Sequence, residues 1–336
     1  MKNGIPTILY TLFLIMNQIL NYSIIIPHKN IPALLKRCLD SIPRRNDVQI
    51  IVVDDNSDPN KVNFEQFPGL NDPFIEVVFT KEGKGAGFAR NIGLEKATGK
   101  WILFADADDY FNECINDIFN DYINFDADIV YFKHNSVDSD THTPAYRCEH
   151  FLKYIDHWLR SKEKADDLLR YRHTSVWSRL HKAELIRKHC ISFDEVMIAN
   201  DVTFAYLSGF YASSIHADMR ILYCTTIRRG SIRHKKKGVD MKLDNLYVSG
   251  KRYLFYKKNK IPVTGDISYI GSLISFFFSE KEAYKKAINT LNNLGYTNSE
   301  ITKLVISFLF IYTPKNVIFY FISLPEKILR RFKIFL

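Results

Sequence analysis

Five apolar residues run directly into three carboxylates in the stretch Trp101-Ile-Leu-Phe-Ala-Asp106-Ala-Asp108-Asp109-Tyr-Phe111. The apolar run from Trp101 to Ala105 predicts a strand that is buried on both faces of a sheet. Burying an unpaired carboxylate is strongly unfavourable, so we expect the acidic residues to lie at the end of this strand. There they would face solvent, a cation or a ligand.

Two of these carboxylates are spaced to act together. Residues two apart in an extended chain point the same way, so Asp106 and Asp108 are expected on one side, with Ala107 turned away. Paired carboxylates beside a polyphosphate suit Mg²⁺ or Mn²⁺, which prefer oxygen ligands. A solvated acidic turn after a strand explains the same residues, and both interpretations remain open.

The composition restricts the class of protein. The chain has 336 residues, of which 46% are hydrophobic, and this is enough to build a full core. Its net charge of +9 suits an anionic partner such as nucleic acid, an acidic membrane surface or a phosphorylated substrate. The five scattered cysteines form no Cys-x-x-Cys pair, which favours a reducing compartment over a disulfide framework or a zinc site.

Strand and helix patterns alternate through the first part of the chain. Helical patterns separate most of the runs expected to be strands, so we predict an α/β unit with a mainly parallel sheet flanked by helices. The expected strands are Tyr22–Ile26, Val48–Val53, Phe74–Thr80, Trp101–Ala105 and Ile129–Phe132.

Polar residues follow three of these strands. Pro27 ends the first, Asp54 and Asp55 end the second, and the acidic stretch at Asp106 and Asp108 ends the fourth. In a parallel sheet these ends meet at one edge, where ligands of α/β proteins bind. The sequence therefore predicts a binding site at the carboxyl edge.

The middle of the chain, from about residue 150 to 235, is mixed and rich in charge, and helical patterns follow it. Asn200 or Asp201 is a possible N-cap of a helix, and beyond Gly238 the helices are dense in Lys, Tyr and Phe. The last segment, Pro325–Leu336, interleaves apolar residues with basic ones. It is interpreted as a helix lying on an anionic bilayer, or as a helix packed on the protein with a solvated basic face.

The chain begins with an apolar leader, residues 1–21. Ile5–Leu20 is nearly all apolar and follows Lys2, which is typical of a signal peptide or a short membrane anchor. No clear cleavage site precedes Tyr22, and Met16 offers an alternative start. A dispensable or misassigned leader, an anchor and a secretion signal are the three interpretations.

Several of these segments together resemble the family 2 glycosyltransferases of the GT-A fold. The resemblance covers residues 22–112 well, thins out to about residue 235 and is not visible beyond it. The matching pieces are Ser23-Ile-Ile-Ile-Pro27 with Asn30, Val52-Val-Asp-Asp55-Asn-Ser57-Asp58, Ala89-Arg90-Asn91-Ile-Gly93, Gly99-Lys-Trp-Ile-Leu-Phe-Ala-Asp106-Ala-Asp108-Asp109, and Asn200-Asp201.

The resemblance implies a role for each matching position on the donor side. Pro27 would border the nucleotide base, Asp55 would accept hydrogen bonds from it, and Asp54 would be buried or supporting. Arg90 would lie near the nucleotide and its diphosphate. Asp106 would face the ribose or the metal ion, and Asp108 would bind the divalent cation, Mn²⁺ or Mg²⁺.

The catalytic base and the donor loop are implied in the same way. Asp201 would be the base, and Arg228, Arg229 and Ser231 match a mobile segment that often closes over the donor. Two positions depart from the family. Lys29 stands where an aromatic residue is usual, which puts base stacking in doubt, and Asn200 replaces the usual Glu, which affects acceptor choice.

Simpler roles compete with some of these assignments. Asp201 would otherwise be a helix N-cap, Asp55 part of an Asx-turn, and Arg90 one member of an ion pair on a helix surface. His234 and Lys235–Lys237 are most simply a solvated basic loop.

With the resemblance, the expected division is a catalytic domain at residues 22–235 and a helical, basic, membrane-associating region at 236–336. Within the catalytic domain, 22–112 would bind the nucleotide and 113–235 the acceptor. The expected activity is inverting transfer of a sugar from a nucleotide donor, a UDP-sugar above others. The acceptor would be lipid-linked or a polysaccharide at the cytoplasmic face of the membrane, and nucleic acid is not an expected partner.

Two alternatives belong to other classes. A sugar nucleotidyltransferase would need a Gly-x-Gly-x-x-Arg phosphate loop after the first strand, where Pro27-His-Lys-Asn30 stands instead. A non-catalytic protein that binds membrane or nucleic acid would not need the full set of aspartates, and no nucleic-acid motif is recognised.

Overall fold

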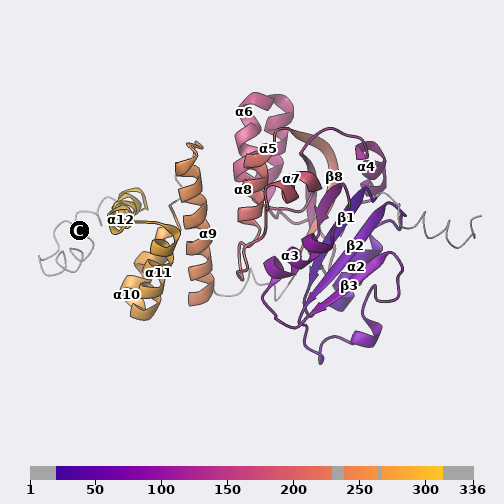
Figure 1. Cartoon of the computed structure of the whole chain (residues 1–336), viewed down its shortest axis with the longest axis horizontal. Helices are drawn as coiled ribbons and strands as arrows, with labels where there is room; N and C mark the ends of the chain where they lie inside the picture. The colour runs from indigo at the N-terminus through magenta and orange to yellow at the C-terminus, as the bar shows by residue number, and fades with distance from the viewer. Residues whose placement is uncertain (1–19, 229–237, 263–266, 313–336) are drawn as a thin grey trace, which may run out of the picture. The chain divides into compact units, whose positions relative to one another are not determined.

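The computed structural model describes residues 20–228, 238–262 and 267–312 (Figure 1). It divides into two compact units. The first comprises residues 1–196 and 200–235, and the second comprises 197–199 and 236–336. The apolar leader up to residue 19, Arg229, Ser231, the segment His234–Lys237 and the tail beyond Pro325 lie outside the described residues.

The first unit is built on an eight-stranded sheet in the order β3-β2-β1-β4-β7-β6-β8-β5. Its first half is parallel, with β1 between β2 and β4 and with β3 beyond β2. The strands are β1 (Tyr22–His28), β2 (Val48–Asp55), β3 (Ile75–Thr80), β4 (Trp101–Phe104), β5 (Tyr110–Phe111), β6 (Ile129–Asp138), β7 (Arg179–Lys182) and β8 (Ile215–Ile227). The α/β fold with helices on the sheet is confirmed.

The second half of the sheet is mixed. The short strand β7 runs antiparallel to both β4 and β6, and β5 runs antiparallel to β8, while β6 and β8 are parallel. Four of the seven strand pairings are parallel, so the sheet is mainly parallel as expected, and the antiparallel pairings all involve β7 or β5. Local apolar patterns predict that a segment is a strand, but they carry no information about the direction of its partner.

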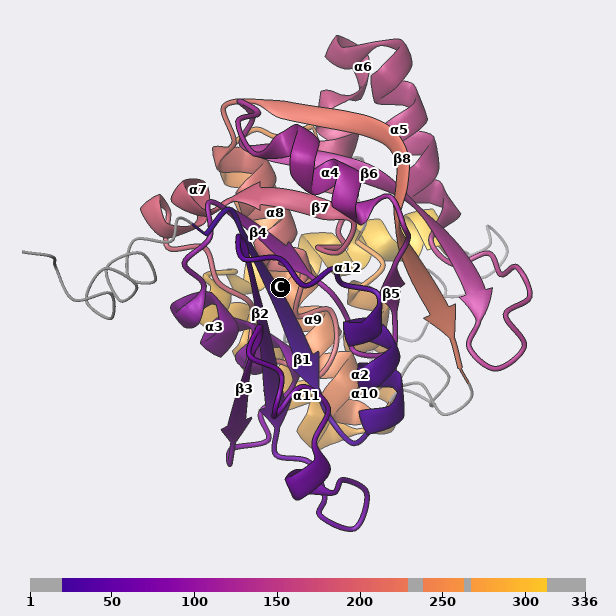
Figure 2. The same ribbon diagram turned by 90° about the vertical axis from the view of Figure 1, so that its right-hand side faces the viewer.

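Helices cover both faces of the sheet. Figure 2 shows α2 (Pro32–Asp40) and α3 (Ala86–Lys96) on opposite sides of β1 and β2. The remaining helices of this unit are α4 (Ile115–Tyr122), α5 (Glu149–Arg160), α6 (Lys162–Asp167), the π-helical turn Leu168–Arg172, α7 (Ala183–Lys188) and α8 (Val202–Tyr211), with a short 3₁₀ turn at Phe64–Gln66.

Strand β4 contributes to both apolar layers, as its sequence predicts. Trp101 and Leu103 belong to the cluster on the α2 side, and Ile102 and Phe104 belong to the cluster that holds α3 and α8. All four side chains are buried. Alternation along an extended strand that is covered on both faces accounts for this pattern.

The pairing of β1 with β4 stops at the carboxyl edge because of Pro27. The amide of Ala105 donates to the carbonyl of Ile25 at 3.1 Å, and residue 27 would donate the next bond of this ladder. Proline has no N–H, so the two strands part there. β1 itself continues to His28 beside β2, two residues beyond its expected end at Ile26.

Helix α3 approaches the segment before α8 closely. A Cβ added at Gly87 would lie 2.1 Å from the carbonyl oxygen of Asp194, so only glycine allows this contact. Gly85, the residue before the helix, has a φ of +97°, which a residue with a side chain rarely adopts. The Gly-x-Gly at the start of α3 thus serves backbone geometry and close packing.

The second unit is helical, as predicted for the end of the chain. It contains α9 (Val239–Lys258), α10 (Ile270–Ser279), α11 (Lys281–Leu294) and α12 (Asn298–Tyr312) around a separate apolar cluster. The hydroxyl groups of Tyr269 and Tyr296 lie 3.0 Å apart inside it. Within the described residues, none of the helices is both long enough and apolar enough to cross a membrane.

Candidate active site

The acidic residues after β4 form a turn rather than an extension of the strand. β4 ends at Phe104, and the amide of Asp109 donates to the carbonyl of Asp106 at 2.9 Å. Ala107 turns into the core, as expected. One carboxylate oxygen from each of Asp106, Asp108 and Asp109 lies within 4.8 Å of the others, so the turn gathers three carboxylates where the strand geometry predicted two.

Asp108 is paired with Arg228, which follows strand β8. Nε of Arg228 donates to Oδ2 of Asp108 at 2.9 Å, and the side chains are 27% and 21% exposed. The antiparallel pairing of Tyr110 with Cys224 brings the end of β8 past the acidic turn. A guanidinium thus lies against the carboxylate predicted to bind the metal ion.

Arg90 joins the acidic turn to the segment before α8. Its Nη2 donates to Asp106 at 2.6 Å, and its Nη1 donates to Asn200 at 2.7 Å. The residue is buried, with its guanidinium 5.3 Å from the ring of Phe193. Because Arg90 is not on the surface of its helix, the simpler explanation as a surface ion pair is wrong. Asn200, which stands where the family that the sequence resembles usually has Glu, accepts the hydrogen bond from Nη1 and holds the arginine.

Asp54 supports the loop that follows β2. It is buried, and it accepts hydrogen bonds from His28 at 2.7 Å and from the amide of Ser57 at 2.9 Å. Burial alone would raise the pKa of Asp54, but the bonds from His28 and Ser57 outweigh it and lower the pKa. Asp54 therefore fixes the loop after β2, and His28, which sequence reasoning passed over, is its partner.

Only one of the two carboxylate oxygens of Asp55 accepts hydrogen bonds among the described residues. Its Oδ2 accepts from Lys29 and from the amide of Gly85, both at 3.0 Å. Its buried Oδ1 has no hydrogen-bond partner among the described residues. A buried acceptor without a donor is unfavourable unless a ligand supplies one. The N–H groups of a nucleotide base could supply such a donor. Lys29, which stands where the resemblance would lead us to expect an aromatic residue, forms an ion pair with Asp55.

Asp109 is the site residue that sequence reasoning left out. It is fully buried, accepts from the amide of Thr226 at 2.6 Å, and lies 3.7 Å from Nη1 of Arg147. Burial, together with the charge of Asp108, raises the pKa of Asp109 well above its usual value. The signal was present in the sequence, because Asp109 directly follows Asp108 in the acidic stretch.

The backbone of the acidic turn is held by residues far along the chain. The amide of Asp106 donates to the hydroxyl of Tyr223 at 2.8 Å. The carbonyl of Asp108 accepts from Arg37 at 2.6 Å and from the hydroxyl of Thr226 at 2.7 Å. These contacts fix the position of the carboxylates, and no local pattern identifies the residues that make them.

Asp201 precedes the first turn of α8. It occupies the N-cap position, as the simpler explanation predicted, but its side chain makes no capping hydrogen bond, so capping does not account for this carboxylate. Its neighbour Asn200 contacts Arg90, and Arg90 contacts Asp106, which connects the start of α8 with the acidic turn. The structure thus gathers Asp106, Asp108, Arg90 and Arg228 directly.

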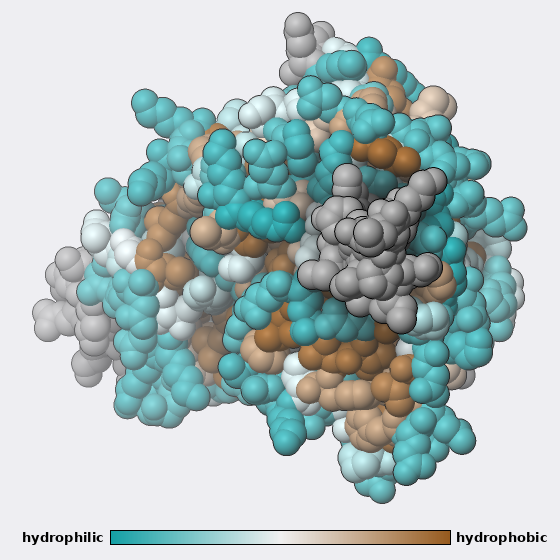
Figure 3. Space-filling model, turned by 45° about the vertical axis from the view of Figure 1, so that its right-hand side comes forward, coloured by the Kyte–Doolittle hydropathy of each residue, from teal (hydrophilic) through white to brown (hydrophobic). Residues whose placement is uncertain are grey.

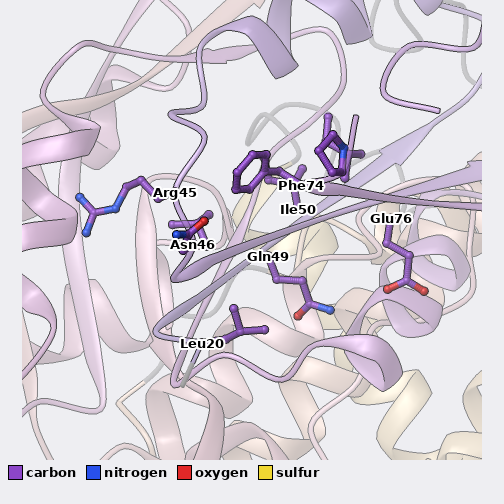
Figure 4. Close-up of a pocket in the computed structure, with 10 residues that line it drawn as sticks. Leu20, Arg45, Asn46, Gln49, Ile50, Phe74 and Glu76 are labelled. Atoms are coloured by element: carbon purple, nitrogen blue, oxygen red, sulfur yellow. The ribbon is translucent and has the colours of Figure 1, made fainter. Parts of the chain in front are cut away.

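A hollow of about 570 Å³ lies elsewhere in this unit (Figure 4). Its lining includes Arg45, Gln49, Phe74 and Glu76, at the beginning of β2 and β3. The predicted site residues follow the ends of the strands, so this hollow is separate from the candidate site.

The donor groups fit a divalent cation. Asp106 and Asp108 are partly exposed, with side chains 27% and 21% exposed, and carboxylate oxygens are the ligands that Mg²⁺ and Mn²⁺ prefer. Asp109 is inaccessible by comparison, since its side chain has no exposed surface. The site therefore offers two accessible carboxylates backed by a buried third.

Comparisons with known proteins show which proteins this chain is similar to. Residues 23–181 match the model of the family "Glycosyl transferase family 2". The chain is 27% identical over 210 residues to the uncharacterised glycosyltransferase EpsJ of Bacillus subtilis, a match covering 59% of this chain and 57% of EpsJ. It is 23% identical over 219 residues to the glycosyltransferase GlyA of Streptococcus pneumoniae, covering 62% of this chain and 31% of GlyA.

The fold also matches a solved structure. TarS of S. aureus (residues 1–349), in complex with UDP-GlcNAc, superposes with a TM-score of 0.57 over 86% of this chain and 85% of that one. The sequences are 19% identical, so this likeness concerns the fold. The matched segments cover less than two thirds of EpsJ and of GlyA.

Proposed function

We propose that this chain, whose residues 23–181 match the model of glycosyl transferase family 2, moves a sugar from a nucleoside diphosphate donor to a hydroxyl group of an acceptor. The observation that carries the proposal is the acidic turn Asp106–Asp109 at the carboxyl edge of a parallel sheet. It adjoins Arg90 and Arg228, which are suited to a diphosphate.

The donor is proposed to be a UDP-sugar. The free acceptor oxygen of Asp55 suits the N–H of a uracil ring, and Pro27 at the end of the β1–β4 pairing would border the base. TarS, which shares the fold, has been crystallised with UDP-GlcNAc. Arg229 and Ser231, which lie outside the described residues, are proposed to join Arg228 at the diphosphate.

Each of the site residues has a separate proposed role in sugar transfer. Asp106 and Asp108 would hold the divalent cation, which when bound neutralises charge on the departing diphosphate. Arg90 and Arg228 would add positive charge at the same group. Asp201 would accept the proton of the acceptor hydroxyl as its oxygen attacks the anomeric carbon. Attack from the face opposite the leaving group inverts the anomeric configuration.

The second unit is proposed to hold the enzyme at the cytoplasmic face of the membrane, near a lipid-linked or polysaccharide acceptor. Residues 236–336 contain 17 Lys and Arg against 7 Asp and Glu, so the net positive charge of the chain resides here. Phe278, on α10, and Ile306, on α12, are exposed. Figure 3 shows one face of the whole chain, on which hydrophobic areas lie between hydrophilic ones, and it labels no residue of α10 or α12. Basic and apolar residues together favour an anionic bilayer.

The membrane proposal is tested with the full chain and a variant lacking residues 326–336. We expect the full chain to sediment with vesicles containing phosphatidylglycerol, and the truncated chain to remain in the supernatant. Vesicles of phosphatidylcholine alone are the control for charge. A truncated chain that sediments as well as the full chain would refute a role for the tail.

The catalytic proposal is tested with Asp108→Asn and Asp201→Asn. A panel of nucleotide sugars is first screened with Mn²⁺ for donors that raise the melting temperature. Asp108→Asn should lose metal-dependent donor binding as well as turnover. Asp201→Asn should keep donor binding and lose about 10²–10⁴-fold in transfer, the usual contribution of a general base.

The surface substitution Asp72→Asn is the matched control, because Asp72 pairs with Arg44 outside the site. Full transfer activity in Asp108→Asn would exclude the metal site. Full activity in Asp201→Asn would mean that another residue is the base.

A further inference from the structure

A fully buried arginine lies in the apolar layer beneath α8. Arg179, at the start of β7, has no exposed surface and is the direct cross-strand neighbour of Tyr131, with its guanidinium 4.4 Å from that ring. Nη2 of Arg179 donates to the ring nitrogen and to the carbonyl oxygen of His173. Its Nε and Nη1 have no hydrogen-bond partner among the described residues.

A buried charge of this kind requires compensation. Burial lowers the pKa of Arg179 to about 10, so the side chain remains cationic at neutral pH. The charges of Tyr131 and Asp201 counteract this lowering. Tyr131 is a neutral phenol at neutral pH, because burial raises its pKa. The countercharge felt by Arg179 under working conditions is therefore that of Asp201.

The packing of α8 indicates that Asp201 is on the side of the helix that faces β7. Asp201, Phe204 and Ala205 share one face of the helix, because residues three and four apart do so, and Phe204 and Ala205 are buried in this layer. The ring of Phe204 packs against His181 at 5.3 Å between centroids. His181 and Arg179 are two apart on β7, so their side chains point to the same face of the sheet.

We propose that Arg179 is a positioning residue for Asp201, whose buried positive charge attracts and orients the carboxylate that accepts the proton of the acceptor hydroxyl. This inference rests on the proposed function. It gives a role to strand β7, which lies between β4 and β6. None of the sequence motifs described above lies in this strand. Arg179 itself touches neither donor nor acceptor in this arrangement.

The first experiment needs no substrate. The melting temperature is measured for Arg179→Met, Asp201→Asn and the double variant of the full chain. Asp201→Asn leaves the buried guanidinium without its countercharge, so it should destabilise the protein that retains Arg179. The same substitution should have little effect in the Arg179→Met background, where no buried charge is left to compensate. Additive shifts in melting temperature would refute the coupling, whatever reaction the protein catalyses.

The second experiment measures transfer from a UDP-sugar selected in the donor screen. Arg179→Met should lower kcat about 10- to 1,000-fold, because it removes part of the contribution of a general base. The KM of the donor and the affinity for UDP with Mn²⁺ should stay within about twofold of the wild-type values. Arg179→Lys should restore at least part of kcat, because it returns the charge. Unchanged kcat in Arg179→Met, or no recovery with lysine in a folded variant, would overturn the positioning role.

The two experiments separate this inference from the proposed function. If wild-type protein transfers no sugar from any donor of the panel, the proposed function fails, while the stability measurements still decide whether Arg179 and Asp201 interact. If transfer is found and the stability shifts are additive, the proposed function stands and the role of Arg179 is refuted.

Discussion

The pairing of Arg228 with Asp108 predicts that this arginine competes with the divalent cation when no nucleotide is bound. A cation that binds Asp108 must first displace the guanidinium, which lies 2.9 Å from the carboxylate. Arg228→Gln removes the competitor, so the affinity for Mn²⁺ alone should increase. With UDP present, Arg228→Gln should instead lower the affinity for Mn²⁺, because Arg228 is proposed to bind the diphosphate.

The size of the effect follows from the exposure of the pair. The two side chains are 27% and 21% exposed, so water screens their attraction and the pair is worth about 1 kcal/mol. Because about 1.4 kcal/mol corresponds to a tenfold change in affinity, we expect the Kd for Mn²⁺ to fall about fivefold in Arg228→Gln. Titration followed by the electron paramagnetic resonance signal of free Mn²⁺ measures this directly.

Arg44→Gln is the matched control. Arg44 pairs with Asp72 at 2.7 Å, the two side chains are similarly exposed at 29% and 26%, and the loss of Arg44 changes the net charge of the protein by the same amount. The control should leave the affinity for Mn²⁺ within about twofold of wild type, the range expected for screened long-range charge effects. An unchanged or weaker Mn²⁺ affinity in Arg228→Gln would refute the competition.

Two further predictions concern the framework of the site. Gly87→Ala should lower the stability by about 1–3 kcal/mol or more in thermal unfolding, because its Cβ would lie 2.1 Å from the carbonyl oxygen of Asp194. Gly238→Ala, which has nothing within 4 Å of the added Cβ, should cost less, about 1 kcal/mol at most for a helix N-cap, and equal losses would contradict the close contact. The lowered pKa of Asp54 means that its charge stabilises the fold above the usual carboxyl pKa, and that this contribution is lost as the pH falls through the lowered value. Asp54→Asn should therefore be destabilised at neutral pH, with a melting temperature that changes less than that of wild type between about pH 5 and pH 3; parallel curves would exclude this linkage.

Local sequence patterns predicted the elements of the nucleotide side well. The runs in β1, β2 and β4 are apolar because both faces are covered, and the polar residues after them mark the shared carboxyl edge. Asp54 and Asp55 show the limit of this reasoning. The same pattern places both at the edge, but the contacts of His28 and Lys29 decide that Asp54 supports the loop while Asp55 keeps an open acceptor.

The sequence by itself predicted the strands β1–β4 and the start of β6, the acidic residues that follow β4, and the family that the motifs resemble, but it did not identify the strands β5, β7 and β8. Only the tertiary structure decided that Arg90 meets Asn200, 110 positions away, and that Arg228 meets Asp108, 120 positions away. Both contacts depend on the order and direction of the strands β7, β6 and β8 beyond β4. Periodicity records how each segment is buried, whereas strand order results from the packing of all segments at once, so residues far apart in the chain complete the site.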